Sequence, residues 1–304
     1  MPELPEVETV VGDLRKELHL SDTYDFSTNP NLSSYPEVSK VFVYSKKLRW
    51  DIPSLDHLVG KHILSLSRRG KYILIQFEDG KLIVHLGMTG VLHWGEEEPS
   101  KHTHVDIVLR VPQHQAPTPK NKFEVKTLRY TDPRRFGLVV WEPKGEVHKV
   151  LQSMGPEPLE NWGWTDLKTS LSGKKIAIKK AIMDNAVVVG VGNIYASEAL
   201  HVANIHPQTL TSSLSDKNIQ ALHQGIIEVL KKGIQHRGAS IRDYQHVDGS
   251  RGQMSDHLLV YGRTGSKCRR CSTNICSEMM GGRNTFFCPS CQKQPTKKQK
   301  ETKK

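Results

Sequence analysis

Two Cys-x-x-Cys pairs near the end of the chain constrain its fold more than any other feature of the sequence. Cys268 and Cys271 form the first pair, Cys288 and Cys291 form the second, and sixteen residues separate them. Each pair places two thiolates on one side of a tight bend, and two such bends complete the tetrahedron that zinc prefers. We therefore predict one zinc ion, with reduced structural thiols or a redox pair as the alternatives. Four cysteine ligands leave no open position for a catalytic water, so the zinc is structural.

The segment between the two pairs is predicted to be a hairpin held by the metal. Its tip reads Gly281-Gly282-Arg283. An arginine on a rigid turn flanked by glycine suits a phosphate contact, although a solvated surface arginine fits the same position. Cys276 lies between the pairs and is expected to be a free thiol.

Charge and hydropathy narrow the class of partner. The net charge of +11 indicates that the chain binds a polyanionic partner, either nucleic acid or an acidic membrane surface. Five of these charges lie in residues 293–304, which are predicted to be a disordered basic tail. No stretch reaches the ~20 apolar residues of a membrane span. Residues 1–6 lack the features of a secretory signal, so we expect a reducing cytoplasm, where cysteine pairs favour zinc over disulfides.

The pattern of the chain predicts an α+β protein. Residues 3–19 have the spacing of an amphipathic helix. Short β-rich runs follow between residues 38 and 142, and they predict a sandwich or barrel. The clearest runs are residues 41–44, 72–77, 82–86, 105–109 and 137–141. Residues 112–126, rich in Pro, Gln and Lys, are predicted to be an exposed loop.

The second half of the chain is predicted to be helical. A linker at 155–158 precedes candidate helices at 176–183, 193–200 and 216–233, and residues 237–265 are predicted to be a loop. The predicted domains are residues 1–150, 151–237, 238–293 and the tail 294–304.

Met1-Pro2 is informative because an initiator Met before Pro can be removed, leaving Pro2 as a free secondary amine. An α-amino group has a pKa of about 8, against about 10.4 for Lys, so much more of it is neutral at pH 7. Such an amine can attack a sugar carbon and form an iminium ion. Glu3 and Glu6 lie nearby, and either could serve as general acid or base. Many unrelated chains also begin Met-Pro.

Eight motifs in order along the chain resemble the formamidopyrimidine-DNA glycosylase family. They are 1–9 (MPELPEVET), 68–72 (RRGKY), 85–90 (HLGMTG), 101–106 (KHTHVD), 129–137 (RYTDPRRFG), 188–200 (VVGVGNIYASEAL), 259–263 (LVYGR) and 282–289 (GRNTFFCP). The resemblance implies an N-terminal helix plus β-sandwich and a C-terminal helix–two-turn–helix domain with a zinc hairpin of four cysteine ligands. It also implies a DNA glycosylase and AP lyase that removes 8-oxoguanine and formamidopyrimidines from double-stranded damaged DNA.

The resemblance implies roles for individual residues. Pro2 forms the Schiff base, Glu3 protonates the opening sugar, Lys71 assists β-elimination and Arg283 assists δ-elimination. Backbone contacts are implied for His102, Arg134, Lys174 and Asn193. Met88, Arg134 and Phe136 are implied to fill the space of the flipped base, which must leave the stack before C1′ can be attacked. Residues 240–254 are expected to close over that base.

Three departures from the family pattern lie at positions to which the resemblance assigns no catalytic role. Asn204 stands where Gly is usual, and the zinc hairpin begins with Ser272-Thr273-Asn274 rather than Gly-Thr-Pro. A further departure is Asp-Asn-Ala-Val at 184–187, where a Lys is common.

Two other functions fit parts of the same pattern. An endonuclease VIII-like glycosylase for oxidised pyrimidines usually begins Pro-Glu-Gly-Pro, whereas Leu4 follows Glu3 in this chain. A non-catalytic binder of damaged DNA would lack Pro2, Glu3 or Lys71, and all three are present. We expect a monomer without membrane association, acting on nucleoid DNA in a bacterial cytoplasm.

Overall fold

The computed structural model describes residues 1–24, 31–45, 47–113, 123–240 and 247–294. The chain forms two compact units, which are described separately. The first unit contains residues 1–153 and 233–255, and the second contains residues 154–232 and those from 256 onwards. Almost all of the predicted tail at 294–304 lies outside the described residues.

The first unit begins with helix α1 (Leu4–Leu18), as the spacing over residues 3–19 predicts. The helix ends at His19, which adopts φ 54° and donates its N–H to the carbonyl of Arg15. A left-handed residue of this kind is a common helix terminator. The apolar stripe of α1 is buried in the core of the unit.

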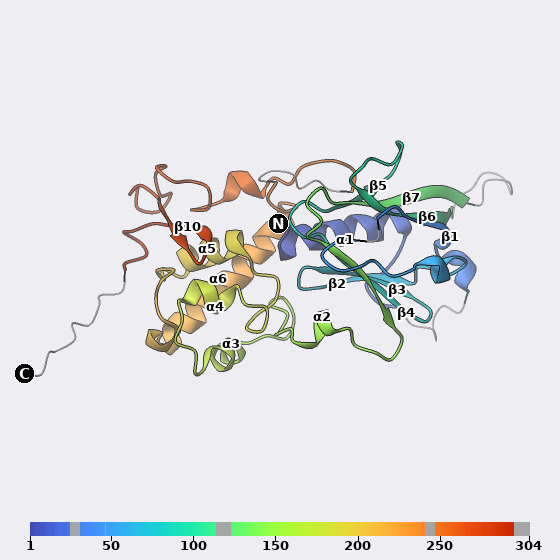
Figure 1. The fold of residues 1–304 in the computed structure, drawn as a ribbon. Helices are drawn as coiled ribbons and strands as arrows, with labels where there is room; N and C mark the ends of the chain where they lie inside the picture. Colours follow the sequence, from blue (N-terminus) through green and yellow to red (C-terminus); the bar gives the residue numbers. More distant parts are fainter. Residues whose placement is uncertain (25–30, 46, 114–122, 241–246, 295–304) are drawn as a thin grey trace, which may run out of the picture. The chain divides into compact units, whose positions relative to one another are not determined.

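Two four-stranded antiparallel sheets form the body of the first unit (Figure 1). One sheet has the order β1-β6-β7-β5 and the other the order β2-β3-β4-β8. The strands are β1 (Glu37–Val43), β2 (Ser65–Arg69), β3 (Tyr72–Phe77), β4 (Gly80–His85), β5 (Val91–Trp94), β6 (Thr103–Pro112), β7 (Phe123–Thr131) and β8 (Leu138–Pro143). Side chains of both sheets and of α1 share one hydrophobic cluster, so the predicted sandwich and helix are confirmed.

The predicted loop at 112–126 is wrong at both ends. β6 extends to Pro112 and β7 begins at Phe123, and these two residues are paired across the hairpin. The side chains of residues 123–125 are exposed, so no buried-exposed alternation marks the start of this strand. Residues 114–122 lie outside the described residues.

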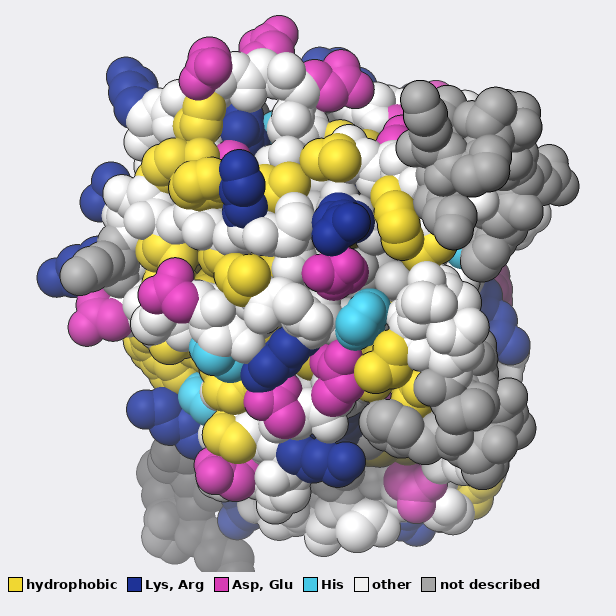
Figure 2. Space-filling view, turned by 90° about the vertical axis from the view of Figure 1, so that its right-hand side faces the viewer, with side chains coloured by type: hydrophobic (Ala, Val, Ile, Leu, Met, Phe, Trp, Pro, Cys, Tyr) yellow, Lys and Arg dark blue, Asp and Glu magenta, His cyan; other side chains and the backbone are white. Residues whose placement is uncertain are grey.

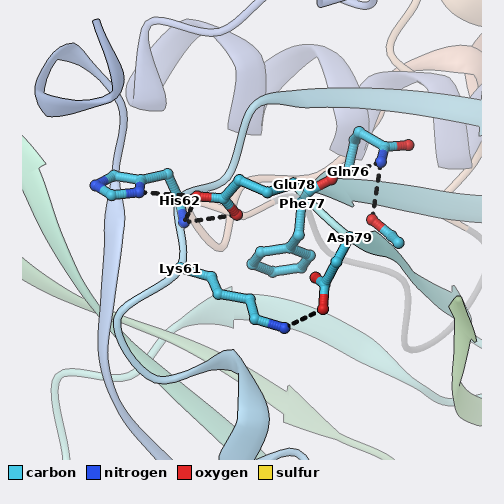
Figure 3. A network of polar contacts seen from close by, with 7 residues as sticks. Lys61, His62, Gln76, Phe77, Glu78 and Asp79 are labelled. Atoms are coloured by element: carbon cyan, nitrogen blue, oxygen red, sulfur yellow. Dashed lines mark hydrogen bonds and ion pairs between the residues drawn. The ribbon is translucent and has the colours of Figure 1, made fainter. Parts of the chain in front are cut away.

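The β3–β4 hairpin shows how polar side chains secure a two-residue turn. Phe77 pairs with Gly80 across Glu78-Asp79. The Glu78 carboxylate accepts the N–H of His62 at 3.0 Å, and Asp79 pairs with the ammonium of Lys61 (Figure 3). Gly80 is required because a Cβ there would lie 2.3 Å from the carbonyl oxygen of Glu142. This turn therefore depends on residues from three separate segments.

The second unit is helical, as predicted. The candidate helices at 176–183, 193–200 and 216–233 are α4 (Ile178–Ile182), α5 (Asn193–Val202) and α6 (Asp216–Gln235). Sequence reasoning missed α3 (Trp164–Leu171), which is short and rich in residues of modest helix propensity. It also missed the one-turn α2 (Lys149–Gln152) of the first unit. Short 3-10 turns are η1 (Leu32–Ser34), η2 (Asp56–Leu58), η4 (Thr211–Ser213) and η5 (Met254–His257), the last within the predicted loop at 237–265.

The cysteine module contains the predicted hairpin, formed by β9 (Cys276–Met280) and β10 (Arg283–Phe287). Met280 pairs with Arg283 across Gly281-Gly282, whose φ angles are 58° and 75°. A two-residue turn with both φ angles positive matches the twist of the strands it joins, which explains the two glycines.

Within the described residues, no helix combines the length and apolar character required to span a bilayer. Figure 2 shows one face of the molecule, on which acidic and basic side chains alternate with small hydrophobic groups. Among the side chains coloured there, the positive charge is not gathered into a uniform basic surface.

Candidate functional site

The N-terminal segment is buried where α1 begins. Pro2 and Glu3 are both buried, and Glu3 is 2% exposed. The N–H of Glu3 donates to Oε2 of Glu6 at 2.8 Å, and its carbonyl accepts the N–H of Val7 at 3.1 Å. Pro2 therefore precedes a residue whose backbone is fixed on both sides.

Glu6 connects this segment to a later part of the chain. Its Oε1 accepts the N–H of Ala239 at 2.7 Å, while Oε2 accepts that of Glu3. Gly238, at φ 77°, lies so close that a Cβ would be 2.8 Å from Cγ of Glu6. Both carboxylate oxygens are thus engaged by backbone donors. Of the two acids left open by the sequence, Glu6 therefore has the geometry of a positioning residue, and the role of Glu3 as acid or base stays a prediction.

Lys71 lies in the turn between β2 and β3, after Gly70 at φ 58°. It is 7% exposed, which is rare for a lysine on a turn. The pKa of His85 is lowered to about 4, first by burial and then by the positive charges of Lys71, Arg49 and the N-terminal amino group. Lys71 and the amino group of Met1 therefore both act electrostatically on the half-buried imidazole of His85.

Met88, Arg134 and Phe136 lie on two loops, 86–90 and 132–137. Met88 is 42% exposed and Phe136 is 47% exposed. The guanidinium of Arg134 lies 4.6 Å from the centre of the Phe136 ring. Apolar side chains exposed to water on both loops carry a free-energy cost. Such exposed apolar groups are typical of residues that insert into a base stack.

Asp132 holds these two loops together, and sequence reasoning missed it. It is fully buried. Its Oδ1 accepts the hydroxyl of Thr89 at 2.6 Å and its Oδ2 accepts the N–H of Gly137 at 2.8 Å. Its own N–H donates to the carbonyl of His102 at 3.0 Å, which places a fourth predicted DNA contact beside the same residue. The one available sequence signal was the place of Asp132 inside the motif at 129–137, which does not reveal its burial.

The loops also meet through glycine. Gly87 has φ 63°, and a Cβ there would lie 2.4 Å from the backbone nitrogen of Gly137. The side chain of Met88 therefore projects from a backbone that packs directly against the loop of Phe136.

In the second unit, Asn193 is the first residue of α5 and its side chain is already engaged. Its Nδ2 donates to the carbonyl of Asn284 at 2.9 Å, and its Oδ1 accepts from Nζ of Lys179 at 2.5 Å. Nζ of Lys179 also donates to the hydroxyl of Thr285 at 2.5 Å. Lys179, 3% exposed, was not singled out from the sequence although a buried lysine needs such partners.

Lys174 lies between α3 and α4. Its backbone is fixed by the hydroxyl of Thr211, which donates to the Lys174 carbonyl at 2.6 Å. Arg283 is exposed at the start of β10, directly after the Gly-Gly turn. The DNA contacts of Lys174 and Asn193 remain predictions.

The four predicted zinc ligands converge. The sulfur atoms of Cys268, Cys271, Cys288 and Cys291 lie within 4.8 Å of one another. Cys268 and Cys291 are 4.0 Å apart, and Cys271 and Cys288 are 3.4 Å apart. A tetrahedral zinc with bonds of about 2.3 Å requires sulfur separations of about 3.8 Å, so the residues present fit the metal. Cys276 is exposed and outside this cluster, as predicted.

Helix α5 organises the second unit around the zinc module. Glu198, which is 1% exposed, accepts the N–H groups of Leu259, Val260 and Tyr261 at 2.7, 2.9 and 2.9 Å. Burial raises the pKa of Glu198, and the three backbone donors oppose that shift. These contacts fix the LVYGR segment that leads into the first cysteine pair.

Three protein-family models match the chain. The formamidopyrimidine-DNA glycosylase N-terminal domain matches residues 1–139, and the formamidopyrimidine-DNA glycosylase H2TH domain matches residues 154–245. The zinc finger found in FPG and IleRS matches residues 265–294.

Individual relatives agree with these models. The formamidopyrimidine-DNA glycosylase of Aliivibrio fischeri (strain MJ11) is 42% identical over 296 residues, which is 96% of this chain and 98% of the relative. Among solved structures, the Lactococcus lactis Fpg with an abasic site containing DNA is similar, with a TM-score of 0.80 and 32% identity over 96% of this chain and 100% of that chain. A structure of MutM with carbocyclic 8-oxo-G containing DNA has a TM-score of 0.79 at the same identity and coverage.

Proposed function

The chain belongs to the formamidopyrimidine-DNA glycosylase family, and from this premise we propose which residues carry out its reaction. It is a DNA glycosylase of base-excision repair that acts on oxidised purines, with the AP lyase activity typical of the family. It binds damaged DNA and has a zinc finger with four cysteine ligands.

Pro2 is the proposed nucleophile. Once Met1 is removed, its secondary amine attacks C1′ of the damaged nucleotide and gives up its proton as the bond from C1′ to the base breaks and the departing base is protonated. The C1′–O4′ bond then breaks and an iminium ion remains between C1′ and the proline nitrogen. The supporting observation is the buried Pro2-Glu3 pair, whose backbone is held by Glu6. A fixed amine meets C1′ without the entropic cost of ordering a free chain end.

Glu3 and Lys71 are proposed to move protons around this amine. Glu3 protonates the ring oxygen as the sugar opens, and its carboxylate follows Pro2 directly in the chain. Lys71 assists the β-elimination that breaks the 3′ phosphodiester bond. Its support is the electrostatic effect on His85 that comes from both Lys71 and the amino group of Met1, the residue directly before Pro2. Arg283 assists the subsequent δ-elimination, leaving a one-nucleotide gap with phosphates at both ends.

The DNA is proposed to be held by His102, Arg134, Lys174 and Asn193, and the vacated base position to be filled by Met88, Arg134 and Phe136. The two loops fixed by Asp132 support the second assignment, because an intercalating group must resist displacement by the stacked bases. Residues 240–254 are proposed to cover the flipped base, and of these residues 241–246 lie outside the described residues.

The zinc ion, when bound by its four cysteines, cross-links the hairpin that carries Arg283.

We also propose that the enzyme acts as a monomer in the bacterial cytoplasm, without membrane association, since the similar proteins are bacterial DNA-repair enzymes. The domain division at residues 150, 237 and 293 is retained as a proposal.

A lesion panel tests this function. Duplexes containing 8-oxoguanine opposite cytosine, or an oxidised pyrimidine, are incubated with enzyme and analysed with and without alkali, which separates base removal from strand cleavage. We expect faster excision of 8-oxoguanine and, for Lys71→Ala, loss of strand cleavage. Faster excision of the oxidised pyrimidine would instead favour the endonuclease VIII-like function.

Lys61→Ala is the matched control. Lys61 belongs to the same unit but pairs with Asp79 at the β3–β4 turn (Figure 3). Partly exposed pairs of this kind contribute about 0–1 kcal/mol, so both activities should be retained. Equal loss of cleavage in the two variants would contradict a specific role for Lys71.

A further inference from the structure

His201 occupies an unusual place at the last turn of α5. It is 1% exposed, and its Nε2 lies 3.6 Å from Sγ of Cys268, one of the four zinc ligands. Its other ring nitrogen, Nδ1, is buried and has no hydrogen-bond partner within the described part of the chain. A buried imidazole with one nitrogen on a cysteine sulfur and the other unsatisfied requires a physical reason.

The chemistry of the sulfur determines which nitrogen carries the proton. A zinc-bound cysteine is a thiolate, which has lone pairs and no proton, so it can only accept. The nitrogen that faces Cys268 must then be Nε2–H, and a neutral ring leaves Nδ1 as the acceptor without a partner. An apolar ring would avoid the cost of this unsatisfied acceptor, and the contact between Nε2 and the sulfur is the interaction that offsets that cost.

We propose that His201 is a positioning residue of the zinc centre, which donates Nε2–H to the Cys268 thiolate. Four thiolates around one Zn²⁺ carry a net charge of −2, and each N–H donor offsets part of the negative charge on sulfur. The backbone N–H of Arg270, 3.4 Å from the same sulfur, is the second donor. Hydrogen bonds of this kind orient a metal ligand and slow loss of the metal.

The same contact joins the zinc centre to α5. Nη1 of Arg270 donates to the carbonyl of His201 at 3.3 Å and also contacts Oδ1 of Asn204, so the first cysteine pair binds both the side chain and the backbone of the helix end. At the opposite end, Asn193 is bonded to the carbonyl of Asn284 in β10. Helix α5 is therefore held at both ends by the zinc module.

Zinc binding then fixes the position of Asn193. The effect of zinc binding on DNA affinity rests on the proposed function of Asn193. The proposed hydrogen bond from His201 to Cys268 is independent of that function. The tests below use the full chain without DNA, so their failure is distinguishable from failure of the proposed DNA contact.

The first test detects the hydrogen bond directly. The full chain is loaded with ¹¹³Cd in place of zinc, and long-range ¹H–¹⁵N spectra identify the protonated ring nitrogen of His201. We expect the Nε2–H tautomer and a scalar coupling between Hε2 and ¹¹³Cd transmitted through the sulfur. An Nδ1–H tautomer without this coupling would overturn the proposal.

The second test measures the rate at which zinc passes from the protein to an excess of a chromogenic chelator. His201→Phe retains a ring of similar size without a donor, and we expect zinc release to be about 10–100-fold faster. His201→Gln retains an N–H donor and should release zinc within a few fold of the wild-type rate. If a folded His201→Phe protein releases zinc at the wild-type rate, the proposal is refuted.

His223→Phe is the matched control for this test. His223 lies in the same unit, but its Nε2 contacts the carbonyl of Trp162 at 3.0 Å rather than a cysteine. Its replacement should leave zinc release unchanged. Equal acceleration in the two Phe variants would mean that general loosening of the unit, rather than loss of the hydrogen bond to sulfur, controls the rate. If His201→Phe does not fold, the ¹¹³Cd measurement on the wild-type chain still decides the proposal.

Discussion

The replacement Glu6→Gln tests how the N-terminal segment is held in place. Glu6 is 1% exposed, and its two oxygens accept N–H groups from Glu3 at 2.8 Å and Ala239 at 2.7 Å. Gln has one acceptor oxygen, and its NH₂ group would face a second N–H donor. The variant therefore loses at least one charge-assisted hydrogen bond and leaves a buried N–H unsatisfied. Each effect costs about 1–3 kcal/mol, and because they overlap we expect a total loss of about 2–4 kcal/mol.

Two measurements detect this loss. Urea unfolding gives the change in the free energy of unfolding, and borohydride trapping on 8-oxoguanine DNA reports whether the N-terminal amine still reaches C1′. We expect trapping to fall because Glu3 is freed next to Pro2. Glu17→Gln is the control on the same helix, since Glu17 forms a partly exposed pair with Lys126 at 3.2 Å that is worth about 0–1 kcal/mol. Equal and small effects of the two substitutions would refute the reasoning.

Three further predictions follow from other parts of the structure. Ser272→Gly should stabilise the protein by up to about 1 kcal/mol in thermal unfolding, since Ser272 adopts φ 59°, and destabilisation would show that its side chain makes a needed contact. Asp106→Asn should cost about 3–5 kcal/mol in urea unfolding, because Arg129 binds both carboxylate oxygens at 2.8 and 2.7 Å inside the unit, and a loss below 1 kcal/mol would contradict this. His85 has its pKa lowered from 6.5 to about 4, so the unfolded chain binds the proton first and stability should fall as the pH drops from about 6.5 to about 4. The loss is at most about 3 kcal/mol. His85→Gln should lose that part of the pH dependence, and an unchanged pH profile would count against it.

The sequence predicted the elements whose burial pattern is regular. The strand at 72–77 alternates between buried and half-buried residues and was located to the residue. The start of β7 was missed because hydrogen bonding to β6 continues where side chains are already exposed. Pairing depends on the partner strand, which a local pattern does not reveal.

The departures from the family pattern acquire a physical meaning in the structure. Asn204 and Ser272 both replace the usual Gly, and both have positive φ, at 56° and 59°. Asn tolerates this backbone conformation better than Ser, and Asn204 also contacts Arg270. Sequence alone marked these positions as unusual without showing the backbone geometry that makes Gly favourable there.

The sequence predicted the site residues whose chemistry requires a particular residue type. It did not predict the buried residues that hold those site residues in position. Four cysteines with zinc spacing were recognised and they converge in the structure. Asp132, Lys179 and His201 were not recognised, because a lone Asp, Lys or His gives no sign of burial in a sequence. Their partners come from distant segments, so their roles depend on the tertiary fold.

Mass spectrometric mapping of the borohydride-trapped complex tests the central claim most directly. The wild-type chain is trapped on a duplex with 8-oxoguanine opposite cytosine, digested, and the peptide bearing the sugar adduct is sequenced. The account predicts removal of Met1, an adduct on the nitrogen of Pro2, and little adduct from Pro2→Gly. An adduct on a lysine side chain, or no adduct from a protein that has lost Met1 and binds the duplex tightly, would contradict amine catalysis by Pro2.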